Sequence, residues 1–188
     1  IIFQRERFIF NLYSNYSMTS NKRCGWVPQD NQIYQDYHDK EWGVPVHNDK
    51  KLFEMLLLEG FQAGLSWSTI LNKRKNFKKA FSNFDYVKIA KYNKKDITRL
   101  MNDAGIVRNR LKIESSIRNA KAYIEIRKEF GSFDKYLCGF VNNKQIKNKF
   151  KNWKQIPPKT ELSDEISKDL KKRGMNFVGS TIIYAFLQ

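Results

Sequence analysis

The spacing of apolar residues constrains the fold of this chain more than any other feature of the sequence. Apolar side chains recur at the three- and four-residue intervals of an α-helix, whereas alternating β-branched runs bounded by turn residues are nearly absent. We therefore expect an all-α protein. The expected helices cover residues 50–59, 66–81, 94–103, 108–130, 132–141, 163–173 and 180–188. The segment 23–45 shows little helical pattern and is expected to be irregular.

The stretch "KKLFEMLLLEGFQAGLSW" contains a glutamate that is predicted to face the core. On a helical projection Glu54 lies on the polar side, where we expect it to be exposed, but Glu59 shares an arc with Leu52, Phe53, Met55 and Leu56. A buried carboxylate is unfavourable unless it has a partner. Glu59 is therefore either a structural residue, capping a turn or pairing with an arginine, or a group that binds a ligand.

Two glycines follow this carboxylate. Gly60 and Gly64 interrupt the helical pattern, so we expect Glu59 to end one helix and Trp67 to begin the next. The carboxylate and the indole would then face the same space.

The segment before this helix is unusually aromatic. Trp26, Tyr34, Tyr37 and Trp42 occur within 17 residues, among several turn formers. Such a density of rings is consistent with a stacking pocket. A small aromatic core beneath a loop would give the same pattern, so both interpretations stay open.

The sequence has two cysteines, Cys24 and Cys138, which are too few for a disulfide framework and indicate a reducing compartment. Cys24 and His38 are residue types that bind zinc, but two ligands make only half of a tetrahedral site. His47 could also bind a metal, although nothing in its surroundings distinguishes it.

A second motif lies near the C-terminus. A helix predicted to begin with Ser163 as its N-cap ends at Gly174 after the basic residues 171–173, and "GMNFVGSTII" leads into another helix at Ser180 or Thr181. The free N–H groups at the start of the second helix could bind a phosphate. An ordinary αα-hairpin with closely packed glycines is the alternative.

The charge of the chain favours a polyanionic partner. It has 35 Lys and Arg residues against 19 Asp and Glu residues, a formal net charge of +16 and a pI near 9.8. Nucleic acid is the commonest partner of such a protein. Anionic membranes, ribosomal RNA or a lysine-rich genome would account for the same numbers.

The ends of the sequence suggest a core with an extension. No apolar run approaches the length of a membrane span, and no targeting signal is recognisable. The chain opens on Ile, has its first methionine at Met18 and stops inside an apolar helical pattern. We expect residues 1–22 to be an extension outside the core, and residues 23–188 to be a single domain that is truncated at its C-terminus.

Five motifs together resemble one protein family. "RCGWV", "YHDKEWGVP", "KKLFEMLLLEGFQAGLSW", "DAGIVRNRLKI" and "LKKRGMNFVGSTI" occur in the order and near the spacing found in type I 3-methyladenine DNA glycosylases. The resemblance runs from about Arg23 to Gln188. It implies a fold of the helix-hairpin-helix glycosylase superfamily, in which "KKRGMNFVGST" is the DNA-binding hairpin.

The resemblance also implies a role for individual residues. Glu59 corresponds to the catalytic carboxylate that hydrogen-bonds the flipped base, and Trp67 to the indole that stacks on it. The remaining base-binding positions are Trp26, Tyr34, Tyr37 and Trp42. The implied DNA contacts are a wedge at Gly64 and Leu65 and a hairpin site at Lys172, Arg173, Gly174, Gly179, Ser180 and Thr181.

The resemblance implies a structural zinc ion as the cofactor. Cys24 and His38 correspond to two of its ligands, while the other two, a His and a Cys in the family, lie beyond the position where this sequence stops. Occupancy by these 188 residues is therefore doubtful.

The expected function is base excision repair of alkylated DNA by a monofunctional glycosylase that hydrolyses the N-glycosidic bond of 3-methyladenine without cleaving the strand. We expect an intracellular, monomeric protein whose partner is double-stranded alkylated DNA and which binds no membrane. The alternative is a non-catalytic basic helical module that binds DNA or RNA, and a further possibility is an inactive fragment.

Overall fold

The computed structural model describes residues 23–146, 148, 150 and 153–188. The helical elements in this part of the chain are α1 (Gln32–Lys40), α2 (Asp49–Gln62), α3 (Trp67–Ala80), η1 (Ser82–Phe84), α4 (Tyr86–Ile89), α5 (Lys94–Asn102), α6 (Arg110–Phe130), α7 (Phe133–Gly139), η2 (Trp153–Gln155), α8 (Glu161–Lys172) and α9 (Ser180–Leu187). The described residues form no β-strand, which confirms the predicted all-α class. None of their helices has the length and apolar character needed to cross a membrane.

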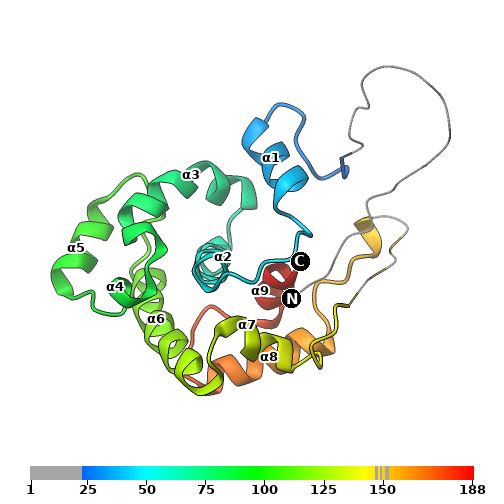
Figure 1. The fold of residues 1–188 in the computed structure, drawn as a ribbon. Coiled ribbons are helices and arrows are strands. Elements are labelled where there is room, and N and C mark those ends of the chain that lie inside the picture. Colours follow the sequence, from blue (N-terminus) through cyan, green and yellow to red (C-terminus); the bar gives the residue numbers. More distant parts are fainter. Residues whose placement is uncertain (1–22, 147, 149, 151–152) are drawn as a thin grey trace.

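Helix α2 is the centre of the fold (Figure 1). It packs against α3, α6, α7 and α9, and it contributes buried residues such as Phe53, Leu58 and Phe61 to the single hydrophobic core. Burial of this face, rather than helix propensity, stabilises α2.

Helix α6 holds both ends of α2. At the N-terminal end, Asp49 pairs with Arg127 and accepts a hydrogen bond from the backbone N–H of Phe133 (3.1 Å). At the C-terminal end, the Lys112 ammonium donates to the carbonyls of Phe61 (2.8 Å) and Ala63 (2.5 Å). An acidic group at a helix start and a basic group at its end are both favourable, because each compensates the helix dipole.

The predicted helices all occur, but the sequence missed α1. Its first turn is capped by the side chain of Asn31, which accepts from the backbone N–H of Tyr34 (3.0 Å). The helix is polar overall and buries Gln35, Tyr37 and His38, so few apolar residues mark its buried face. The irregular segment expected over 23–45 was therefore partly wrong. The short helix α4 was missed as well.

Two predicted boundaries also need correction. Glu59 does not end its helix, because α2 continues through Gly60 to Gln62. A Cβ atom at Gly60 would lie 3.5 Å from Phe177, an ordinary contact distance, so Gly60 is a helical residue at the contact with the hairpin and does not form a turn. Ser163 is not the N-cap of α8: Thr160 caps the helix, and Ser163 completes a reciprocal capping box with it.

Candidate active site

The structure gathers the five aromatic residues predicted to form the base pocket into one continuous cluster. The ring centroids of Trp42 and Trp26 lie 5.0 Å apart, those of Trp26 and Tyr34 5.6 Å, and those of Tyr34 and Tyr37 6.4 Å. Tyr37 reaches Trp67 at the start of α3, with a centroid distance of 5.4 Å. The aromatic residues of the N-terminal segment thus extend to the indole beside α2.

Glu59 lies next to this cluster and is buried, as its position on the helical projection predicted. Its side chain is 3% exposed, and loss of hydration raises its pKa to about 8. No arginine or lysine pairs with it within the described part of the chain, so the structural interpretation finds no support there. Burial and then the Glu59 charge raise the pKa values of Tyr34 and Tyr37, which indicates how near the three side chains are.

Trp67 presents a second buried polar group. Its indole Nε1 has no hydrogen-bond acceptor among the described residues. Buried donors are almost always paired in folded proteins, so this N–H can pair with a water molecule or a ligand. Glu59 and Trp67 can thus offer an acceptor and a donor, with aromatic rings around them.

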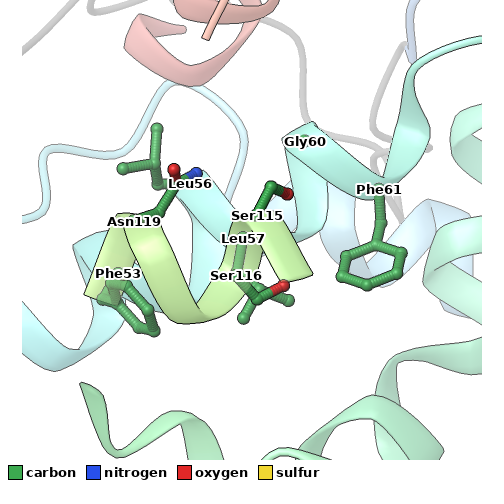
Figure 2. Close-up of a pocket in the computed structure, with 8 residues that line it drawn as sticks. All are labelled: Phe53, Leu56, Leu57, Gly60, Phe61, Ser115, Ser116 and Asn119. Carbon is green, nitrogen blue, oxygen red and sulfur yellow. The ribbon is translucent and has the colours of Figure 1, made fainter. Parts of the chain in front are cut away.

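Two hollows lie along α2. Figure 2 shows the first, a cavity of about 10 Å³ between Gly60 of α2 and Ser115, Ser116 and Asn119 of α6, which is far too small for a purine. A groove of about 270 Å³ touches Tyr37, but its lining includes neither Glu59 nor Trp67. Neither hollow by itself is a base site.

A charge network fixes the aromatic segment to the core. Arg74 of α3 binds both carboxylate oxygens of Glu41 (2.7 and 2.8 Å) and one of Glu54 (2.7 Å), and Lys51 also donates to Glu41 (2.7 Å). Glu54 was expected to be exposed, but its side chain is only 17% exposed because Arg74 covers it. Since Glu41 directly follows α1, this network holds the Tyr37-bearing helix against α2 and α3.

The loop between α2 and α3 carries the two residues implied as a wedge. Gly64 has a positive φ of 76°, which a residue with a side chain rarely adopts. Leu65 is 40% exposed, and it directly precedes the Ser66 N-cap of α3. The loop thus projects an apolar side chain into solvent close to Trp67.

Helices α8 and α9 pack side by side and form the predicted helix-hairpin-helix (Figure 1). Lys172, Gly174 and Thr181 are exposed, and Gly179 begins α9 without a side-chain cap, so the first N–H groups of the helix remain available to an anion. The Ser180 hydroxyl lies 2.7 Å from that of Ser163, which leaves its backbone N–H as the group that can face a phosphate.

Arg173 differs from the other basic residues of the hairpin. Its guanidinium binds Asp169 (2.6 Å) and Glu129 (2.6 Å), and it lies over the rings of Phe130 and Tyr136. These contacts occupy most of its donors within the protein. Arg173 therefore stabilises the end of α8, whereas Lys172 is directed to solvent.

The two residues predicted to bind zinc lie together. The backbone N–H of Cys24 donates to Nε2 of His38 (3.4 Å), and Nδ1 of His38 donates to Asp39 (2.8 Å), which Arg23 also binds. This arrangement makes Nε2 the unprotonated ring nitrogen, which is the tautomer that binds metals, and the Cys24 N–H occupies its lone pair in this structure. No group of three or more candidate ligands occurs among the described residues, and Cys24 and Cys138 form no disulfide there. His47 contacts Asp134 instead (2.9 Å).

Sequence reasoning missed two polar residues on the buried face of α6, Lys112 and Asn119. Lys112 is 6% exposed and Asn119 is 7% exposed. They are seven residues apart and so share a helix face, and a lysine on the apolar arc of a predicted helix was a signal that could have identified them.

Helical domains that join a helix-hairpin-helix to an aromatic pocket with a buried carboxylate are DNA glycosylases of the helix-hairpin-helix class. A family model described as methyladenine glycosylase matches residues 26–188. The chain belongs to the methyladenine glycosylase family.

Individual relatives agree with this assignment. The chain is 49% identical over 167 residues to DNA-3-methyladenine glycosylase 1 of Escherichia coli strain K12, covering 89% of both proteins. A crystal structure of 3-methyladenine DNA glycosylase I is 44% identical, with a TM-score of 0.85 over 89% of this chain and 91% of that one. The Staphylococcus aureus enzyme, whose solved structure concerns 3-methyladenine recognition, is 37% identical with a TM-score of 0.82 over 84% of both chains.

Proposed function

We propose that this protein removes 3-methyladenine from alkylated DNA by hydrolysing its N-glycosidic bond, and that Glu59 reads the damaged base. The observation that carries this proposal is the burial of Glu59 beside an aromatic cluster, with no charge partner in the described residues. Membership of the methyladenine glycosylase family and close similarity to 3-methyladenine glycosylases support the same reaction.

The chemistry of the lesion explains why such a pocket would select it. A base within a duplex must be flipped out before an enzyme can reach it. A purine methylated at N3 carries positive charge while it is bound to deoxyribose, which makes it a good leaving group and strengthens its stacking on indole and phenol rings. Trp67, with Tyr34, Tyr37, Trp26 and Trp42, would supply those rings.

Glu59 would supply the charge discrimination. Because its pKa is raised to about 8, it is mainly neutral at pH 7 in the empty pocket. A cationic base favours the carboxylate form, so its arrival releases the proton and replaces the hydration that Glu59 lost on folding. Unmodified adenine has no charge and cannot stabilise the carboxylate. After the base departs, water attacks C1′, and no lysine Schiff base is required.

The remaining surface would bind double-stranded DNA as a monomer. The exposed Lys172 and the N–H groups of Gly179, Ser180 and Thr181 suit a phosphate, and the protruding Leu65 suits the space left by a flipped base. The net charge of +16 favours the approach of a polyanion. Binding of this kind should weaken steeply with salt.

Cys24 and His38 would serve as two ligands of a structural zinc ion. Their proximity and the Asp39 contact fit that role, and a metal there would hold the N-terminal segment in place. Cobalt titration tests this, because thiolate coordination gives a charge-transfer absorption. We expect any such band to be lost in Cys24→Ser; a band that survives this substitution would contradict the zinc proposal.

The deciding experiment measures release of free 3-methyladenine from methylated duplex DNA. We expect release by the protein and a loss of at least about 100-fold in Glu59→Gln, which keeps the shape but cannot carry the charge. Glu54→Gln is the matched control, because Glu54 lies on the same helix and pairs with Arg74. A folded native protein that binds duplex DNA without releasing base would favour the alternative, a non-catalytic binding module.

A further inference from the structure

Lys112 is a buried cation that the proposed mechanism does not use. Its ammonium donates to the carbonyls of Phe61 (2.8 Å) and Ala63 (2.5 Å), at the end of α2, and burial lowers its pKa. No carboxylate pairs with it in the described chain. The last carbonyls of a helix have no partner within the helix, so Lys112 fixes the point where α2 passes into the loop that carries Leu65.

The same face of α6 also holds the DNA-binding hairpin. The Asn119 side-chain amide donates to the backbone carbonyl of Asn176 (2.8 Å) and accepts from its N–H (2.8 Å). Between the two residues, the Ser115 and Ser116 hydroxyls donate to the Lys112 carbonyl (2.7 and 2.9 Å). Figure 2 shows Ser115, Ser116 and Asn119 turned toward α2. Lys112 and Asn119 with the two serines are called the α6 polar strip below.

The hairpin also touches α2 directly. Phe177, at a positive φ of 53°, packs at Gly60, the residue after Glu59, where an added Cβ would meet Phe177 at 3.5 Å. Lys112 Nζ lies 5.9 Å from the centre of the Phe177 ring. The loop with Leu65, the carboxylate helix and the hairpin therefore meet on one face of α6.

We propose that the α6 polar strip is a positioning element that sets the distance between the phosphate-binding hairpin and the loop with Leu65. When the hairpin binds the DNA backbone, a fixed distance between the hairpin and the loop places Leu65 and the pocket at one defined nucleotide. Lys112 and Asn119 act through these two segments and do not touch the base. This inference rests on the proposed glycosylase function.

A comparison of duplex and single-stranded substrates tests the proposal. Flipping a base out of a duplex costs a few kcal/mol, because the base must be unpaired and unstacked. A base in a single strand largely avoids this cost. Lys112→Met removes the cation at one end of the strip. Asn119→Ala removes the two hydrogen bonds to the Asn176 backbone at the other end. We expect each to lower kcat/KM on methylated duplex DNA by about tenfold more than on the methylated single strand, with the Kd for free 3-methyladenine unchanged.

The controls separate positioning from a loss of folded protein. Lys121→Met changes an exposed lysine of the same helix and should leave both substrates unaffected. The double variant should lower the ratio of kcat/KM on duplex to kcat/KM on single strand by less than the product of the two single effects. The reason is that both residues set the same distance, between the hairpin and the loop with Leu65. If Lys112→Met does not fold, Asn119→Ala alone decides the question.

Two results would overturn the inference. Equal losses on both substrates would show that the strip only stabilises the fold, and unchanged rates would show that the distance does not matter. Either result would leave the glycosylase function intact. Failure of the native protein to release 3-methyladenine from either substrate would instead contradict the proposed function itself.

Discussion

The ring of Tyr37 lies 5.4 Å from that of Trp67, with 62° between their planes, so the two residues meet edge to face beside the buried Glu59. Tyr37 belongs to the largely polar helix α1, and Trp67 begins a helix 30 residues later. A planar base that stacks on the indole would contact the tyrosine at its edge. From this relationship we expect different tasks for the two rings, stacking for Trp67 and edge contact for Tyr37.

Replacement of Trp67 should therefore weaken base binding, by an amount that depends on the residue that replaces it. Stacking of a base on an aromatic residue contributes about 1–3 kcal/mol, so we expect Trp67→Ala to lower kcat/KM on methylated duplex DNA by roughly 10- to 100-fold. Trp67→Phe keeps a smaller ring but removes the buried N–H, and an intermediate loss is expected. Equal activity of the alanine variant and the native protein would show that the indole does not stack on the base.

The rate of excision should depend on the protonation of Glu59. Since the pKa of Glu59 is about 8 and a cationic base prefers the carboxylate, kcat/KM on methylated DNA should rise with pH up to about 8 and then become constant. Glu59→Gln should be slow and show no such rise. A native profile that is flat between pH 6 and 9 would contradict the role of Glu59.

Stability should change with pH in the opposite direction. A carboxyl whose pKa is raised by burial keeps its proton in the folded state at pH values where the unfolded chain has lost it, so stability falls as pH rises from about 4.5 to 8. We expect Glu59→Gln to be more stable than the native protein at pH 8.5, by on the order of 5 kcal/mol. The two should be nearly equal at pH 4.

Urea unfolding at both pH values measures this difference. Glu54→Gln is the control, and it should lose stability at pH 8.5 because it weakens the pair with Arg74 (2.7 Å). If Glu59→Gln instead has a lower free energy of unfolding than the native protein at pH 8.5, the Glu59 charge has a favourable partner.

The hairpin arginine and lysine should differ in their effect on DNA binding. Lys172 is exposed and is expected to contact a phosphate, so Lys172→Ala should reduce the slope of log K against log salt by about one. Arg173 is bound to Asp169 and Glu129 (2.6 Å each), so Arg173→Ala should leave the slope unchanged and lower the free energy of unfolding instead. Fluorescence anisotropy with a labelled duplex measures the slope between about 50 and 300 mM salt, a range over which the Debye length shortens by a factor of about 2.5. A reduced slope in the arginine variant would contradict this division.

The sequence alone determined the class of the fold and the inward direction of Glu59, because helical periodicity is a local property that needs only the order of apolar residues. It also placed the starts of α3 and α9, where Ser66 and Gly179 precede the first helical residue. The motifs were sufficient to identify the family. These features require no knowledge of which segments meet.

Only the tertiary structure decided which distant residues act together. Helix α1 has few apolar residues, and the Arg74 network and its aromatic contacts hold it against α2 and α3. Gly60 lies within α2 and meets Phe177, a residue more than 100 positions later in the chain. Lys112 is buried because α6 brings it to the open carbonyls of α2. Such contacts depend on packing between segments far apart in the chain, and no local pattern of residues encodes that packing.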